Sequence, residues 1–184
     1  MKIKLLFFAI SLGFFGCTGG NTDTTDANTV ELPTTIEGIE AFAATVYNET
    51  SKKIDPQKAM DYVKACETYA AANATDPKSP EILLKAAETA RNVEQHDRAI
   101  AIYDLVLSTF SSYPKAPQAL FLKAFTLDDN MGNKEGAKVL YEEFIEKYPN
   151  NDFAESAKFM LENLYKTDAE IIQEFENKRK EGEQ

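Results

Sequence analysis

The chain has 184 residues, of which 43% are apolar and 27% charged, with 30 acidic side chains against 20 basic ones. This length suits one globular domain or a short repeat array, and a net charge of −10 repels nucleic acid and anionic lipid headgroups. A single histidine and two cysteines leave few groups for hydrolytic or redox chemistry, so we predict no catalytic residue, no metal site and no cofactor.

Residues 1–16 have the order of a secretory leader: two lysines near the start, an apolar run from Leu5 to Phe15, and then the small residue Gly16. As a helix, the apolar run would extend about 16 Å, roughly half of the ~30 Å hydrocarbon core that a permanent span must cross. We therefore predict a signal peptide that is removed, not a transmembrane anchor.

Cys17 directly follows this leader, and Leu12-Gly13-Phe14-Phe15-Gly16-Cys17 resembles the lipobox of bacterial lipoproteins. In that family the cysteine carries acyl chains such as palmitate and becomes the first residue of the mature protein. The resemblance implies that Cys17 is the lipidation site, and two or more acyl chains anchor a protein firmly. Phe14 stands where the family usually has Leu, so ordinary secretion with an unmodified Cys17 is the alternative.

The next segment, up to Pro33, is rich in Thr, Asn, Asp and Gly and is almost free of apolar residues. Such a composition predicts a disordered tether whose reach is roughly 20 Å, so residues 17–33 would combine this tether with the acylated cysteine that the resemblance implies. In lipoproteins of this kind, Asp after the cysteine marks inner-membrane retention, whereas this chain has Thr18. The resemblance therefore implies an outer-membrane protein that faces the periplasm, with display on the cell surface as the alternative.

Residues 34–184 show apolar spacings of three and four and no alternating apolar and polar run, which predicts an all-α domain. Prolines at Pro56, Pro80 and Pro117, and a capping box formed by Thr167 and Glu170, indicate where helices begin. Short links between helices favour antiparallel neighbours. The eight expected helices cover about 35–51, 56–73, 80–93, 96–110, 117–130, 134–147, 152–165 and 168–179.

A small residue followed four positions later by an aromatic one recurs along this domain, and proline follows the first three of these pairs. The pairs are Ala65 with Tyr69, Ala99 with Tyr103 after 34 residues, Ala137 with Tyr141 after a further 38, and Ile171 with Phe175 after a further 34.

This pattern resembles the tetratricopeptide repeat (TPR) over about residues 35–179. The resemblance implies antiparallel helical hairpins stacked as a right-handed solenoid, in which alanines let helices approach closely and aromatic rings fill the space between hairpins. Stability then comes from the interfaces between neighbouring hairpins. In the third repeat, Phe125 stands where the family prefers Gly and Asp128 where it prefers Tyr, which leaves the helix spacing there open.

In this family the first helix of each pair lines a concave surface that binds partners. The resemblance therefore implies a binding surface on the second and third hairpins, where Leu84 and Leu122 supply apolar contacts and two lysines repeat at the same place. Its residues are Leu84, Lys85, Glu88, Arg91, Asn92, Leu122, Lys123, Thr126, Asp129 and Asn130.

Three other features invite a more specific interpretation. Asp128 begins a segment similar to a calcium loop, but its glycine falls one place early and no glutamate closes it, so we interpret the segment as a turn. His96 has no second histidine near it and fits a solvated turn. Cys66 would lack an intramolecular partner once Cys17 is acylated. Its helical context favours a buried thiol, with an intermolecular bridge or a redox or metal role as alternatives.

In general build the chain is similar to the TPR lipoproteins of outer-membrane protein assembly and to the TPR domains of Tol-Pal-associated periplasmic proteins. This resemblance implies a membrane-anchored, non-enzymatic scaffold that binds an envelope protein or peptide and no nucleic acid. The alternative is a surface lipoprotein that captures an extracellular ligand or polysaccharide, and a cell-wall hydrolase is a third hypothesis. The sequence leaves the oligomeric state open.

Overall fold

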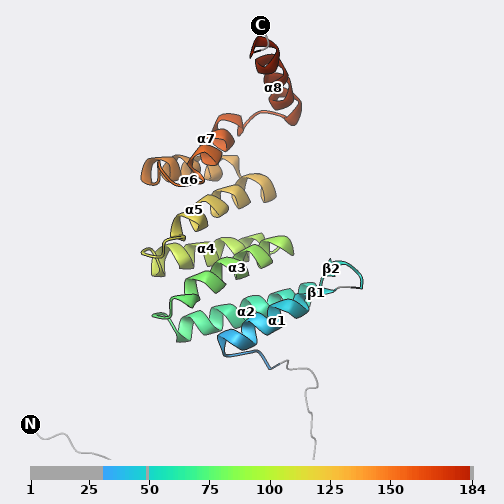
Figure 1. Ribbon diagram of the computed structural model, residues 1–184, viewed down its shortest axis with the longest axis vertical. Helices are drawn as coiled ribbons and strands as arrows, with labels where there is room; N and C mark the ends of the chain where they lie inside the picture. Colours follow the sequence, from blue (N-terminus) through green and yellow to red (C-terminus); the bar gives the residue numbers. More distant parts are fainter. Residues whose placement is uncertain (1–30, 49, 183–184) are drawn as a thin grey trace, which may run out of the picture. The chain divides into compact units, whose positions relative to one another are not determined.

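A computed structural model of the protein describes residues 31–48 and 50–182 (Figure 1). The predicted leader, Cys17 and all but the last few residues of the predicted tether lie outside the described residues. The description below concerns the unit that begins at Leu32.

This unit is a stack of helices that lie one after another in chain order (Figure 1). Each helix from α1 to α6 packs against the next, which confirms the predicted all-α solenoid of helical hairpins. Within the described residues, no helix is both long enough and apolar enough to cross a membrane. The helices are α1 (Ile36–Val46), α2 (Pro56–Ala72), α3 (Lys78–Asn92), α4 (His96–Thr109), α5 (Ala116–Phe125), the π-helical turn η1 (Thr126–Asn130), α6 (Lys134–Lys147), α7 (Ala154–Asn163) and α8 (Asp168–Gly182).

Several of these helices begin with a side-chain cap, at positions where the sequence predicted a boundary between helices. The Asp55 carboxylate accepts hydrogen bonds from two backbone N–H groups in the first turn of α2, and Asn133 does the same for one N–H of α6. Thr167 and Glu170 form the predicted capping box: the Thr167 N–H donates to the Glu170 carboxylate at 2.7 Å, and the Glu170 N–H donates to the Thr167 hydroxyl at 3.3 Å. These caps satisfy donors that a helix start otherwise leaves unpaired.

The first helix is shorter than predicted. The expectation of a helix over 35–51 is wrong beyond Val46, where the chain enters an antiparallel ribbon of β1 (Tyr47–Asn48) and β2 (Lys53–Ile54). The Asn48 side-chain oxygen accepts hydrogen bonds from the N–H groups of Thr50 and Ser51, at 3.0 and 2.8 Å. This local side-chain bonding offers the backbone an alternative to the helix, and it closes the turn between the strands.

The predicted helix over 117–130 changes geometry after Phe125, at the place where the third repeat departs from the family pattern. The N–H of Met131 donates to the Thr126 carbonyl, five residues back, which is the bonding of a π-helix. Thr126 is fully buried, and its hydroxyl donates to the Leu122 carbonyl at 2.7 Å. Such back-bonding from a threonine competes with regular helix bonding and bends helices.

The core divides into two groups of buried side chains. The N-terminal cluster comes from α1 to α4 together with Ala119, and the C-terminal cluster comes from α5 to α7 and the residue Leu164. The partly buried Leu107 and Leu122 pack against both clusters, so they form the joint between them.

The repeated small and aromatic residues lie in these clusters. Ala65, Ala99 and Ala137 are fully buried, and so are Tyr103 and Tyr141, which agrees with close helix approach at the alanines. The earlier member of the series, Tyr69, is only partly buried, and its hydroxyl donates to the Asp76 carboxylate in the loop before α3. This bond lowers the pKa of the Asp76 carboxyl, because it favours the ionised form.

The last member of the series departs from the pattern. Phe175 is 56% exposed, so the expectation that it fills a space between hairpins is wrong. Among the described residues, α8 does not pack along α7 as the preceding helices pack on their neighbours. It is attached by the Phe159 and Phe175 rings, whose centroids lie 6.0 Å apart, and by an ion pair of Lys166 with Glu174 at 2.7 Å.

Candidate functional site

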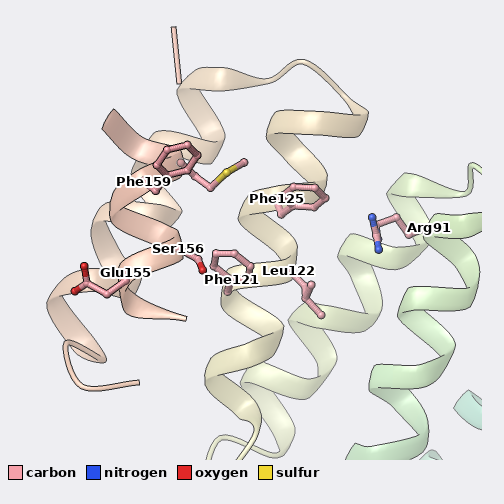
Figure 2. A pocket seen from close by; sticks show the side chains of 8 residues that line it. Arg91, Phe121, Leu122, Phe125, Glu155, Ser156 and Phe159 are labelled. Atoms are coloured by element: carbon pink, nitrogen blue, oxygen red, sulfur yellow. The ribbon is translucent and has the colours of Figure 1, made fainter. Parts of the chain in front are cut away.

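An apolar groove of about 510 Å³ lies where α3, α5 and α7 come together (Figure 2). These are the first helices of three successive pairs, so the groove occupies the position that the repeat pattern predicts for partner binding. We call it the α3–α5–α7 groove. Its lining consists of Arg91, Phe121, Leu122, Phe125, Glu155, Ser156, Phe159 and Met160.

Aromatic packing builds one wall of this groove. The ring of Phe121 stacks on that of Phe153, with centroids 4.9 Å apart, and meets the buried Phe144 edge-on at 5.8 Å. Phe125 from α5 and Phe159 from α7 complete the apolar lining, and Phe159 is 41% exposed (Figure 2). An apolar side chain that enters the groove would remove this aromatic surface from water, which is favourable.

The one cationic side chain of the lining is Arg91, in the last turn of α3. Its guanidinium carbon lies 5.6 Å from the centroid of the Phe125 ring, within the range of a cation–π contact. Within residues 31–48 and 50–182, no carboxylate forms an ion pair with Arg91, and its buried Nε has no hydrogen-bond partner. An unpaired buried donor is costly, so a carboxylate or carbonyl of a bound segment would stabilise this end of the groove.

Neither of two neighbouring groups, Tyr103 and Glu155, neutralises the positive charge of Arg91. Burial raises the pKa of Tyr103 to about 12, so its phenol stays neutral at physiological pH and supplies no counter-ion. Glu155, the only acid in the lining, pairs with Lys158 at 2.7 Å. The groove therefore combines an apolar wall with one available positive charge.

Of the predicted binding residues, the structure brings Arg91 and Leu122 into the groove. Two others are not accessible: Leu84 is only 6% exposed, and Thr126 is fully buried with its hydroxyl bonded to a backbone carbonyl. The expectation that Leu84 and Thr126 present their side chains to a partner is therefore wrong.

The other predicted binding residues lie outside the lining. Lys85 pairs with Glu81 at 2.9 Å along α3, and Lys123 reaches Asp104 on α4 at 2.6 Å, so both charges are already compensated. The remaining four are partly or fully exposed and take no part in the groove, namely Glu88, Asn92, Asp129 and Asn130.

Sequence reasoning missed the contribution of α7. Phe159 and Met160 follow Phe121 and Leu122 by 38 residues, the same interval that separates the second and third tyrosines of the repeat. Extending the alignment of first helices by one more repeat would have placed both residues on the binding face. Phe125, which departs from the family pattern, also lines the groove.

Cys66 is fully buried, as its helical context favoured, and it is a free thiol. Burial raises the pKa of its thiol to about 12, so the reactive thiolate is scarce at neutral pH. This burial argues against an intermolecular bridge. Within the part of the chain that the structure describes, no three His, Cys, Asp or Glu side chains are grouped to hold a metal ion.

Comparison with known proteins identifies one repeat in this region. A model of the tetratricopeptide repeat family matches residues 118–151, which contain most of α5, all of η1 and α6, and three residues of the groove. No curated protein matches the chain. Tetratricopeptide repeats typically bind protein partners and generally act as non-enzymatic scaffolds, so the matched repeat indicates a role in protein–protein interaction.

Proposed function

We propose that the protein is a membrane-anchored, non-enzymatic scaffold that binds an envelope protein or peptide in the α3–α5–α7 groove. The observation that carries this proposal is the groove itself, which lies on the first helices of successive pairs and includes Phe121, Leu122 and Phe125 of the matched repeat. Its function is to position a partner.

The chemistry of the lining specifies the kind of segment that fits. Phe121, Phe125 and Phe159 favour an aromatic or aliphatic side chain, while Arg91 favours a carboxylate close to it. The expected ligand is therefore a peptide segment with a large apolar residue next to an acidic residue or a chain end. Apolar anchors supply the affinity of such sites, and charged hydrogen bonds fix orientation.

The membrane anchor in this proposal rests on the leader and on the lipobox resemblance of Cys17. Acylation there would tie the scaffold to the outer membrane, and the tether would let it work clear of the lipid surface. A periplasmic location gives access to envelope proteins, whereas display on the cell surface would favour an extracellular ligand. Digestion of intact cells with protease separates these two cases, because only the surface protein is cleaved before lysis.

Photocrosslinking in the native cell tests the groove. We expect the photoreactive residue benzoyl-phenylalanine at Phe159 to capture one dominant envelope protein, because this side chain is both exposed and part of the lining. The matched control carries the same residue at Val139 of α6, which is more exposed and lies outside the groove. Equal capture at both positions, or no adduct at Phe159, would contradict the proposal.

The captured partner then allows a second measurement. Arg91→Met keeps an unbranched apolar stem and removes the charge, so we expect the dissociation constant to rise about tenfold, the size of one charge-assisted hydrogen bond. Lys85→Met serves as the control, because Lys85 lies on the same helix and already pairs with Glu81.

The anchor is tested by Cys17→Ala. We expect this variant to move from the membrane fraction to the soluble fraction, because it lacks the atom that carries the acyl chains. Fractionation with immunodetection measures the change, and Cys66→Ala provides a matched control that should stay with the membrane. A Cys17→Ala protein that remains membrane-bound would refute anchoring through this residue while leaving the groove proposal untouched.

A further inference from the structure

Helix α8 exposes an apolar strip that the rest of the described chain covers only in part, through the contact of Phe159 with Phe175. Ile172 and Phe175 are 58% and 56% exposed, and they share a shallow hollow with Glu176 and Arg179. On the side of α8 that faces α7, Ile171 and Lys178 line a second hollow with Phe159, and Phe175 borders this hollow as well. Apolar side chains that lie side by side on an exposed helix face are typical of a protein–protein contact.

Charged residues bound the strip at both ends. Asp168 precedes Ile172 by four residues, and Arg179 follows Phe175 by four, so helical geometry places all four side chains along one face. In the described chain, neither Asp168 nor Arg179 takes part in a hydrogen bond or an ion pair of its side chain. Along the helix, the strip therefore consists of an acidic residue, two apolar residues and a basic residue, at spacings of four, three and four positions.

We propose that α8 is a self-association surface, which pairs antiparallel with α8 of a second copy about a twofold axis. In a twofold interface, if residue i of one copy meets residue j of the other, then j also meets i. Centring the axis between Ile172 and Phe175 places each Ile172 against the Phe175 of the other copy. The same register places each Asp168 beside the Arg179 of the other copy.

Charge complementarity selects this arrangement over its rivals. A parallel pairing of the two helices would set Asp168 against Asp168 and Arg179 against Arg179, which is unfavourable. The antiparallel pairing instead forms two opposite-charge contacts around an apolar centre. Because the strip covers few turns, the interface is small, and we expect a dissociation constant of roughly micromolar magnitude.

Sedimentation velocity of the full chain tests this proposal. The chain carries Cys17→Ala and is kept in a density-matched detergent, so that acyl chains do not contribute to association. We expect a monomer–dimer equilibrium between about 1 and 100 μM, at the affinity expected for a small interface. Ile172→Lys should abolish the dimer, whereas Val139→Lys, which adds the same charge to another exposed apolar site, should leave it intact.

Charge reversal gives a sharper result. Asp168→Arg and Arg179→Asp should each sediment as monomers, because each homodimer then contains two like-charge contacts. An equimolar mixture of the two variants should form heterodimers, because both contacts between them again join opposite charges.

The proposal would be overturned by a monomeric parent chain at 100 μM, by a dimer that survives Ile172→Lys, or by a mixture that stays monomeric while far-ultraviolet dichroism shows α8 intact. If either charge reversal unwinds α8 through an unfavourable interaction with the helix dipole, the test rests on the mid-helix Ile172→Lys variant, which should still abolish the dimer. The result is independent of the groove, because Ile172 and the two charged residues lie outside its lining.

Discussion

Phe144→Ala is expected to lower the free energy of unfolding by about 3–5 kcal/mol, the range for truncation of a buried aromatic ring. Phe144 is fully buried in the C-terminal cluster, and its ring centroid lies 5.8 Å from that of Phe121 and 5.5 Å from that of Tyr148. Truncation removes both ring contacts and leaves a cavity that the rigid helices cannot fill. Because Phe121 also lines the groove, the variant should weaken the capture of a partner.

Urea denaturation measures this loss, and amide hydrogen exchange locates it. Since a helical repeat array is held by contacts between neighbours, exchange should accelerate more in α5 to α7 than in α2 to α4. Val139→Ala on the exposed side of α6 is the control and should change stability by about 0.5 kcal/mol or less. A loss below about 1 kcal/mol for Phe144→Ala, or equal acceleration in both clusters, would contradict the assignment of this ring to a separate C-terminal cluster.

Ala137→Leu tests close helix approach and is expected to cost about 1–3 kcal/mol, the usual penalty for overpacking a core. Ala137 is fully buried on α6, which packs against both α5 and α7. The longer side chain must push α6 away from a neighbour or adopt a strained rotamer. The measurement is the thermal midpoint, with Val139→Leu as a control on the exposed face of the same helix. An unchanged midpoint for Ala137→Leu would show that the helices do not depend on a small residue here.

The repeat could be recognised in the sequence because helix packing requires residues of particular size at fixed positions. Ala99 and Ala137 leave room for a neighbouring helix, and Tyr103 and Tyr141 fill the space beside it, so a small residue and a large one recur at a fixed separation. Capping residues were equally informative, since the Thr167 and Glu170 pair satisfies helix donors by local bonding. Patterns of this kind join residues within one or two helical turns, so they can be recognised in a single sequence.

Two features of the fold were missed because local bonding competes with apolar periodicity. Asn48 caps a turn that ends the first helix early, and the buried Thr126 accompanies a π-helical turn. Asparagine and threonine also occur inside regular helices, so the presence of either in a sequence does not reveal which hydrogen bonds its side chain forms. Thr126 is buried by packing that only the folded structure supplies, whereas Asn48 is exposed and its bonding is set by the turn that it closes.

The binding surface predicted from the sequence coincides only in part with the lining of the candidate groove. Arg91 and Leu122 belong to both, whereas Leu84 lies in the core and Phe159 lines the groove without being part of the predicted surface. Neighbouring residues on a helix differ by about 100° in direction, so a small error in rotation exchanges a buried side chain for an exposed one. The π-helical turn shifts this rotation further beyond Phe125, where the family pattern also fails.

The groove spans the joint between the two clusters, since Arg91 belongs to α3 whereas Phe125 and Phe159 belong to α5 and α7. A bound segment that contacts both Arg91 and Phe159 would therefore link the two clusters across the joint formed by Leu107 and Leu122. The stability of a helical repeat array is approximately the sum of the stabilities of its repeats and of the interfaces between neighbours. Partner binding in the groove would therefore stabilise the two clusters against separation at this joint.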